Sequence, residues 1–280
     1  MSQFFIRAQH LVPQHALSKF AGRFADSRNP RIRDPLIRRF AATYDVDMSE
    51  AERPLGQYES FNDFFTRALK PRARPLADPA EYVLSPADGA VSQAGPIAGG
   101  RIVQAKARDY SVAELLGGDA DAASRFEGGR FVTIYLSPKD YHRVHMPAAG
   151  TLRQTRYVPG DLFSVNGVTA EGVDRLFARN ERLACLFDGP HGIFASVMVG
   201  AMIVAGIETV WGGREQAHAR TPRHRTFADG QHIFAAGDEM GRFFLGSTVV
   251  LLFEPGEVEW DESLSAGSSV RMGQAIGRWS

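Results

Sequence analysis

The sequence predicts an α+β fold that is predominantly β, in which N-terminal amphipathic helices precede a β-barrel or sandwich-like core. Residues 1–75 carry apolar side chains at helical spacing among arginines and lysines. From residue 76 to 280, short apolar or alternating runs recur between glycines and prolines, a pattern typical of strands. With 280 residues, 44% of them hydrophobic, the chain can bury a large core. We therefore expect a helical arm over 1–75 and a β-rich core over 76–280.

Three helices are expected in the arm. The first follows the apolar residues between positions 4 and 24 and is broken at Pro13, because proline interrupts a helix. The second covers the apolar positions of 36–44. The third covers 61–69, with Ser60 placed to cap its first turn.

Short strands are expected throughout the core, separated by turn residues. The predicted strands are 89–94, 101–105, 131–136, 150–158, 183–187, 193–199, 201–207 and 243–253. Two small helices, 111–116 and 172–178, interrupt them, and 214–230 is interpreted as a polar loop. Ser111 with Glu114 predicts a capping box at the first of these helices.

Composition excludes several classes of protein. Acidic and basic residues number 32 each, so overall charge predicts neither a nucleic-acid partner nor an acidic one. Residues 1–40 nevertheless hold eight basic residues against two acidic ones, which makes the arm basic. The single Cys185 lies in an apolar run and is expected to be a buried, reduced thiol. No signal peptide is recognised, and the longest apolar stretch, 195–207, is too short for a transmembrane helix.

A small-residue step, Gly246-Ser247-Thr248, interrupts the aromatic and β-branched run of 243–253. Small residues weaken a strand, so the step marks either a bulge or a place where another group must come close. Glycine leaves its carbonyl accessible, and the hydroxyl of Ser247 follows it directly. We interpret the approaching group as this hydroxyl, which attacks the preceding carbonyl.

A serine nucleophile needs a base, and a base histidine is usually oriented by a carboxylate. Candidates are His142 and His145 in the segment 137–147, and Asp88 in the segment 84–89. Each has a simpler interpretation. Asp88-Gly89 is a common hairpin turn, and both histidines could be core or surface residues. Their three-residue spacing could also suggest a metal site, but no cysteine or carboxylate cluster completes a ligand set, so no metal is expected.

Six segments carry a combined signal that none carries alone: 85–89, 141–147, 159–166, 176–182, 206–211 and 241–248. In this order, and over most of the chain, they resemble the phosphatidylserine decarboxylase family in its bacterial proenzyme form. Members of this family are pyruvoyl-dependent lyases of phospholipid synthesis. The resemblance implies conversion of phosphatidylserine to phosphatidylethanolamine and CO2.

The resemblance also implies self-cleavage at the Gly246–Ser247 bond. In the family's Leu-Gly-Ser-Thr motif the serine becomes a covalent pyruvoyl group, here at position 247, and this is the cofactor expected. The substrate amine then forms a Schiff base with the pyruvoyl carbonyl, which withdraws electrons as the carboxylate departs. Cleavage would give chains 1–246 and 247–280, which stay folded together as a heterodimer.

Site roles follow from the same resemblance. His145 is expected to be the general base for cleavage, with Asp88 holding its tautomer and stabilising the imidazolium. His142 is the candidate for protonating the α-carbon after CO2 leaves and for contacting the head group. Ser164 and Asn166 match a segment that lines the head-group pocket, although a capped turn after residues 159–160 explains them equally well.

A substrate in the membrane would explain the basic arm as a membrane-binding segment. Its apolar and basic residues suit an interfacial helix on anionic lipid, although the same apolar face could instead pack on the β core. We expect a peripheral protein on the cytoplasmic face of the cell membrane, with phosphatidylserine as its partner. The processed units could also pair as homodimers.

Other classes make different demands on the sequence. A non-enzymatic carrier-type β-barrel module would make Gly246-Ser247 a harmless defect. A pyruvoyl decarboxylase could act on a different serine phospholipid or on a soluble amino acid, but a soluble substrate leaves the basic arm unexplained. A serine hydrolase would use Ser247, His145 and Asp88 on an external ester, yet the Gly-x-Ser-x-Gly context is missing.

Overall fold

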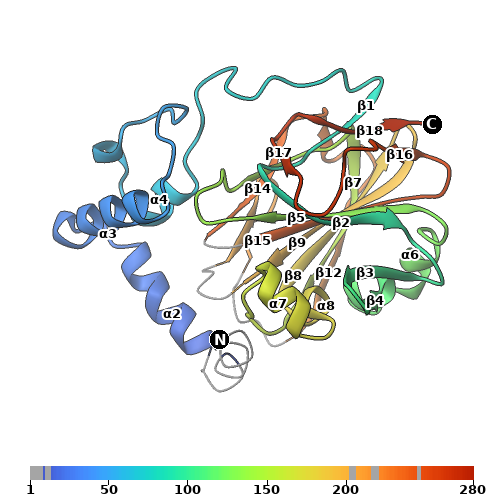
Figure 1. Cartoon of the computed structure of the whole chain (residues 1–280), viewed down its shortest axis with the longest axis horizontal. Coiled ribbons are helices and arrows are strands. Elements are labelled where there is room, and N and C mark those ends of the chain that lie inside the picture. Colours follow the sequence, from blue (N-terminus) through green and yellow to red (C-terminus); the bar gives the residue numbers. More distant parts are fainter. Residues whose placement is uncertain (1–8, 10–13, 202–205, 216–220, 245–246) are drawn as a thin grey trace.

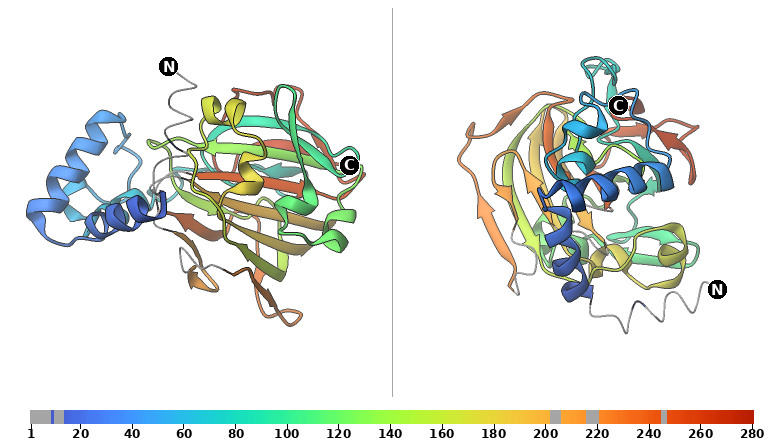
Figure 2. Two further views of the ribbon diagram at one scale, coloured as in Figure 1. Left: turned by 90° about the horizontal axis from the view of Figure 1, so that it is seen from below. Right: turned by 90° about the vertical axis from the view of Figure 1, so that its left-hand side faces the viewer.

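A computed structural model describes residues 9, 14–201, 206–215, 221–244 and 247–280. Its helices α2, α3 and α4 project from one end of a β-rich body (Figures 1 and 2). The predominantly β, α+β fold predicted from the sequence is confirmed, and the β-rich body is built from several antiparallel sheets.

Three helices form the arm: α2 (Gln14–Ala25), α3 (Pro30–Thr43) and α4 (Phe61–Phe65). The Ser60 hydroxyl caps α4 by accepting the backbone N–H of Asp63 at 3.1 Å, as predicted. A 3-10 turn over Leu55–Gln57 leads into α4.

The third helix is shorter than the sequence pattern indicates. It ends after Phe65, because Thr66 donates from its hydroxyl to the Asn62 carbonyl at 2.8 Å and the chain turns there. The Arg67 N–H then bonds to the Phe64 carbonyl at 3.1 Å. The predicted end at residue 69 is wrong, because this turn outweighs the helical spacing of the residues beyond it.

The three helices enclose a hydrophobic cluster that is distinct from the clusters of the β-rich body. Its fully or mostly buried members are Ala25, Ile37, Ala41, Val46, Tyr58, Phe61, Phe64 and Phe65. On α2, by contrast, Leu17, Phe20 and Phe24 are exposed. The arm residues Phe4, Phe5 and Leu11 lie outside the described residues. Among the helices that are described, none is long and apolar enough to cross a membrane.

A nine-stranded sheet forms the centre of the body. Its strands follow the order β12-β7-β8-β9-β15-β5-β2-β17, and β13 also pairs with β7. All of the pairings are antiparallel. The strands are β2 (Gly89–Pro96), β5 (Arg130–Leu136), β7 (Gly150–Val158), β8 (Arg182–Gly189), β9 (Gly192–Gly200), β12 (Arg223–Thr226), β13 (Ile233–Phe234), β15 (Ser247–Phe253) and β17 (Ser269–Val270).

Smaller elements cover both faces of this sheet. A four-stranded sheet has the order β11-β10-β14-β6, a three-stranded sheet the order β1-β18-β16, and β3 pairs with β4. These strands are β1 (Tyr82–Leu84), β3 (Arg101–Ala105), β4 (Arg108–Ser111), β6 (Arg143–His145), β10 (Ile207–Thr209), β11 (Gly213–Arg214), β14 (Glu239–Phe243), β16 (Val258–Trp260) and β18 (Ala275–Trp279). The short helices are α5 (Val112–Leu115), α6 (Ala120–Ser124), α7 (Gly167–Gly172) and α8 (Leu176–Arg179).

Alternation along β15 assigns its residues to two hydrophobic layers. Val250 and Leu252 pack with β3, β4 and helices α5–α8 on one face. Val249, Leu251 and Phe253 pack with the three- and four-stranded sheets on the other face. The β core is therefore a sandwich built on a central sheet, which is the second of the two predicted forms.

Most predicted strands are found within a few residues of their expected ends. The capping box at Ser111 and Glu114 is also present, at the start of α5. The helix predicted over 172–178 is wrong, because the chain forms α7 and α8 with a left-handed Arg175 between them. The strand predicted over 201–207 lies mostly outside the described residues. The polar loop of 214–230 contains β12, which adds an edge strand to the central sheet.

Asn180 fastens the segment that leads into α7 to the central sheet. Its buried amide donates to the carbonyls of Phe163 at 2.8 Å and Gly200 at 2.9 Å. Its Oδ1 accepts the Phe163 N–H at 3.1 Å. One side chain thus satisfies three buried backbone groups, each of which would be costly to leave unpaired.

Replacing Asn180 by alanine should destabilise the protein by about 3 kcal/mol, at about 1 kcal/mol for each hydrogen bond lost. The free energy of unfolding can be measured by urea titration in a Ser247→Ala background, which keeps a single uncut chain. Asn29→Ala, which removes one exposed helix cap, provides the control. Equal losses in the two variants would contradict the assigned role of Asn180.

Candidate active site

The chain changes sheets at the Gly246-Ser247 step. Before it, β14 pairs with β6 and β10 in the four-stranded sheet. After it, β15 pairs with β5 and β9 in the central sheet. The single strand predicted over 243–253 is therefore wrong, since the apolar run belongs to two strands with different neighbours. Leu245 and Gly246 lie outside the described residues.

Ser247 is the first residue of β15. It pairs with Leu136 on β5 and with Gly200 on β9, and it is fully buried. Its Oγ has no hydrogen-bond partner among the described atoms. An unpaired buried hydroxyl costs free energy and calls for an explanation, and a role in chemistry would supply one.

His145 ends β6 and is largely buried, with 9% of its surface exposed. Its Nδ1 lies 2.8 Å from the Gly237 carbonyl, which can only accept, so we assign the ring proton to Nδ1. Nε2 is then an acceptor, and the Tyr141 hydroxyl donates a hydrogen bond to it at 3.0 Å. Burial lowers the pKa of His145, which favours a neutral ring with a basic Nε2.

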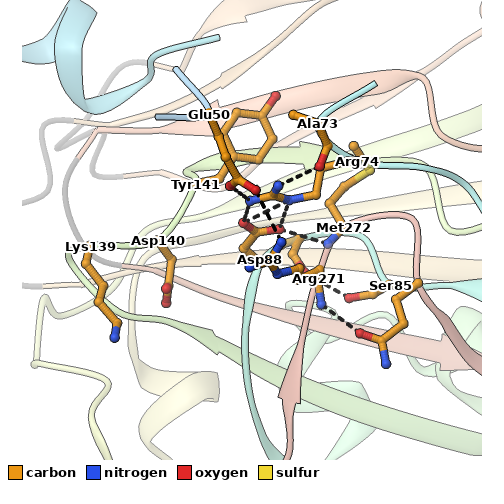
Figure 3. A network of polar contacts seen from close by, with 12 residues as sticks. Glu50, Ala73, Arg74, Ser85, Asp88, Lys139, Asp140, Tyr141, Arg271 and Met272 are labelled. Carbon is orange, nitrogen blue, oxygen red and sulfur yellow. Dashed lines mark hydrogen bonds and ion pairs between the residues drawn. The ribbon is translucent and has the colours of Figure 1, made fainter. Parts of the chain in front are cut away.

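Asp88 lies immediately before β2 and is held by Arg74. The Arg74 Nε donates to Oδ1 at 2.8 Å, and its Nη2 donates to Oδ2 at 2.5 Å. Asp88 also accepts the Met272 N–H at 2.9 Å. Arg74 makes a second ion pair, with Glu50 at 2.8 Å, and Figure 3 shows its guanidinium between the two carboxylates.

The structure thus places the Gly237 carbonyl, and not the Asp88 carboxylate, on the Nδ1 of His145. Asp88 lies close enough for its charge to raise the pKa of His145, although the effect of burial is larger. The two residues are brought into one region without a direct hydrogen bond. Any support that Asp88 gives to an imidazolium there would act through its field.

His142 is fully buried, and its ring centre lies 4.0 Å from that of Phe65 on α4. Its Nδ1 lies 2.9 Å from the Asp140 carbonyl and is therefore assigned the ring proton. Burial lowers the pKa of His142 to about 3, so the ring is neutral at pH 7. Nε2 keeps a free lone pair, because it has no hydrogen-bond partner among the described atoms.

The segment that contains His142 is connected to both β14 and β15, the strands before and after Gly246-Ser247. β5 ends at Leu136, the partner of Ser247, and the chain then leads through 137–141 to His142. The His142 carbonyl accepts the N–H of Phe243, the last residue of β14. The segment that carries both histidines therefore follows β5, the neighbour of β15, and also bonds to the end of β14.

Ser164 and Asn166 lie before α7 and differ in their surroundings. The Asn166 Oδ1 caps α7 by accepting the Thr169 N–H at 3.0 Å. The Ser164 N–H donates to the side chain of Gln9, in the arm, at 2.8 Å. Ser164 also lines an apolar groove of about 400 Å³ between the arm helices and the β core, whereas Asn166 does not.

Two cavities border the segment 137–147 that carries the histidines, an apolar groove and a polar cleft. The apolar groove is lined by side chains that include Phe24, Phe40, Phe61, Phe65, Tyr135 and Pro138. A polar cleft of about 260 Å³ lies on the Asp88 side and is lined by residues that include Glu50, Arg67, Arg74, Lys139, Tyr141 and Arg271. Phe65 borders the groove and also contacts the ring of His142, which does not itself line the groove.

Sequence reasoning missed several contributors to this site. Arg74 and Gly237 act across 14 and 92 residues of chain, and no local pattern marks them. Tyr141 belongs to the recognised 141–147 segment, but the sequence gives no sign of its bond to His145. Within the described residues, no group of three or more His, Cys, Asp or Glu side chains is arranged to hold a metal ion.

Comparison with known proteins adds an independent observation. The family model described as phosphatidylserine decarboxylase matches residues 61–278, and a second model, described as PSD, matches residues 4–45. The phosphatidylserine decarboxylase proenzyme of Bordetella pertussis is 56% identical over 279 residues, covering 98% of this chain and 94% of that protein. The proenzyme of Pseudomonas fluorescens is 56% identical over 277 residues, covering 98% and 96%. The chain belongs to the phosphatidylserine decarboxylase family.

Proposed function

We propose that this protein cleaves itself between Gly246 and Ser247, forms a pyruvoyl group at position 247, and decarboxylates phosphatidylserine to phosphatidylethanolamine. The observation that carries the proposal is the buried, unpartnered hydroxyl of Ser247 at the first residue of a central strand. The term proenzyme in the names of the relatives supports a processing step.

The surroundings of Ser247 fit a pyruvoyl group. Conversion of serine replaces the CH2OH group by a methyl group, and no side-chain hydrogen bond is lost because Oγ has no partner among the described atoms. The side chain lies on the same face of β15 as Val249 and Leu251, which pack in an apolar layer. A methyl group is more favourable there than a hydroxyl.

In the cleavage step, the Ser247 Oγ attacks the Gly246 carbonyl and the acyl group moves from nitrogen to oxygen. His145 is the proposed base, since burial favours a neutral ring in which Nε2 is the acceptor nitrogen. This nitrogen accepts the Tyr141 hydroxyl, and we propose that Tyr141 passes the serine proton to it. Asp88 stabilises the imidazolium through its field.

Loss of the Ser247 Cα proton then expels the Gly246 carboxylate. The remaining dehydroalanine takes up water and releases ammonia, which leaves the new group at position 247. When formed, this group supplies a carbonyl that binds the substrate amine and withdraws electrons from the α-carbon as CO2 leaves.

His142 is the proposed proton carrier in decarboxylation. Its neutral ring must gain a proton before it can give one, and the substrate's ammonium group must lose one before its nitrogen can react. We propose that Nε2 takes this proton and later delivers it to the α-carbon. Burial suits this role, because water is excluded from the carbon that is to be protonated.

The two products of cleavage stay together because of the sheet. Chain 247–280 contributes β15, which is hydrogen-bonded to β5 on one side and to β9 on the other, both in chain 1–246. It also contributes β17 and β18, which pair with β2 and β1. We therefore propose a permanent heterodimer of the two chains. Pairing of such units into a homodimer stays a prediction.

The arm of residues 1–75 is proposed to hold the protein on the cytoplasmic membrane surface, with 76–280 as the catalytic core. Leu17, Phe20 and Phe24 are exposed on α2 beside the basic Arg23, as expected for a helix at a lipid interface. The apolar groove between arm and core would receive a lipid substrate on its way to His142.

Mass spectrometry of the purified protein should detect a chain of residues 1–246 and a chain of residues 247–280 that begins with a pyruvoyl group. Ser247→Ala removes the nucleophile and should stay at full length. An uncut chain that retains its serine and still decarboxylates phosphatidylserine would exclude the proposed chemistry.

Substitutions of His145 and His142 should affect different steps, cleavage and decarboxylation respectively. His145→Ala or Asp88→Asn should slow the appearance of cleaved chains on denaturing gels. His142→Ala should be cleaved but decarboxylate about 100-fold or more slowly, the usual effect of losing a general acid. His224→Ala, on the exposed edge strand β12, is the control and should behave as the unaltered protein. Normal cleavage in both His145→Ala and Asp88→Asn would refute their assigned roles.

Removing exposed apolar side chains from α2 should weaken membrane binding. The double variant Leu17→Ser, Phe20→Ser should bind vesicles that contain anionic lipid at least about tenfold more weakly, since each buried side chain contributes about 1.5–3 kcal/mol. Co-sedimentation measures this. Ile233→Ser changes an apolar residue on β13 that is more exposed than Leu17 and Phe20 and should leave binding unchanged. Equal effects of the two changes would argue against the arm as the contact surface.

A further inference from the structure

Arg67 is a buried cation with an unusual set of partners. It follows α4 and is 3% exposed. In the part of the chain that the structure describes, it forms no ion pair, and its Nε and Nη1 have no hydrogen-bond partner. Burial lowers its pKa, against the nearby groups of Tyr58, Asp88 and Asp140, which raise it. A residue retained at such a cost needs a reason beyond stability.

The guanidinium of Arg67 lies over the Phe64 ring, 5.6 Å from its centroid, and Nη2 forms its hydrogen bonds to the histidine segment. Its Nη2 donates to the Lys139 carbonyl at 2.9 Å and, over a longer distance of 3.4 Å, to the Asp140 carbonyl. The Asp140 carbonyl is also the acceptor for the Nδ1 of His142 at 2.9 Å. Arg67 therefore holds the backbone that fixes the orientation and tautomer of His142.

The neighbouring residues of α4 strengthen this connection. Phe65 packs on the His142 ring. The Thr66 carbonyl accepts from Arg143, on the other side of His142, at 2.9 Å. Three consecutive residues, 65 to 67, thus contact the ring of His142 and the backbone or side chains on both sides of it.

The charge of Arg67 also acts on the ring directly. It opposes protonation of His142 and so lowers the pKa of this residue, after the larger effect of burial and against the effect of the Asp140 carbonyl. Among the described residues, burial, the Asp140 carbonyl and Arg67 are the influences on the pKa of this histidine. A neutral residue in place of Arg67 would lose the field, and a lysine would keep the field but lose the planar guanidinium.

We propose that Arg67 is a positioning residue for His142, which holds the 139–140 backbone so that the Nε2 lone pair stays free and correctly aimed. This proposal rests on the role of His142 put forward above. It concerns decarboxylation and not cleavage, because Arg67 has no bond to His145 or Ser247 among the described contacts.

The test compares Arg67→Gln and Arg67→Lys, with Arg53→Gln as the matched control. Arg53 lies in the same arm and pairs with Asp63 of α4, so its loss disturbs the arm without touching residues 139–142. Three measurements are made on each protein: the extent of cleavage on denaturing gels, kcat and KM for phosphatidylserine in mixed micelles, and the titration of the His142 ring by NMR. The NMR sample is the uncut Ser247→Ala chain, and the His142 signal is assigned by its loss in His142→Gln.

Arg67→Gln should be cleaved normally, with kcat reduced about tenfold to 100-fold and KM changed less than about twofold, since only the alignment of a reacting group is altered. The pKa of His142 should rise, because a positive charge that opposed protonation is gone. The low-pH limb of kcat should then move to higher pH. Arg67→Lys should keep the low pKa and recover part of kcat, whereas Arg53→Gln should change neither.

An unchanged titration and tautomer of His142 in Arg67→Gln would overturn the proposal, whatever the activity. Equal losses in Arg53→Gln would do the same, because they would indicate a general effect on the arm. If Arg67→Gln does not fold, full kcat in Arg67→Lys would refute the need for a planar guanidinium. If His142→Ala decarboxylates normally, the role of His142 fails instead, and the NMR titration still decides whether Arg67 positions the ring.

Discussion

The hydrogen bonding of β15 to strands on both sides underlies the rest of the structure. This strand lies between β5 and β9 and pairs with each over all seven of its residues, from Ser247 to Phe253. A backbone fixed in this way holds Ser247 at a defined place and excludes water from it. The same pairings would keep the strand in the sheet after the proposed cleavage, because they hold it there independently of the chain connection. A cut at the edge of the body would lack this support.

A change of sheet accompanies the proposed cleavage site. Between β14 and β15 the chain leaves one sheet and enters another, so it must abandon one set of partners before it gains the next. Before the crossing, Phe243 is the last residue of β14. Beyond it, at Ser247, the ladder is paired on both sides.

Burial and backbone carbonyls determine the state of both histidines. His142 and His145 each place Nδ1 on a carbonyl, that of Asp140 and that of Gly237, and each is held neutral by burial. The one difference lies at Nε2. In His145 this nitrogen accepts from Tyr141, whereas in His142 it has no partner within the described structure. Two similar rings three residues apart are thereby given different chemical properties, which suits their assignment to two different steps.

Local sequence was sufficient for the features that depend on near neighbours. The caps at Ser60 and Ser111, most strands of the central sheet, and the segments that reveal the family could all be recognised in the chain. Their signals are hydrophobic period and short-range hydrogen bonding, which are expressed within a few residues. Asp88, His142, His145 and Ser247 became candidates through the combined resemblance of the segments that hold them to one family, since Asp88 and the two histidines taken alone also have simpler structural interpretations.

Long-range contacts decided the rest, since they depend on which strands become neighbours. The apolar run of 243–253 has one local pattern but belongs to two sheets, and only the pairing of β14 and β15 reveals this. Asp88 was expected to orient His145, but Arg74 binds Asp88 and a carbonyl 92 residues away takes the place on the ring. The chain thus specifies from its own residues what chemistry is available. Packing of distant segments determines which atom faces which, because hydrogen bonds and burial act over a few ångströms in space, whatever the distance along the sequence.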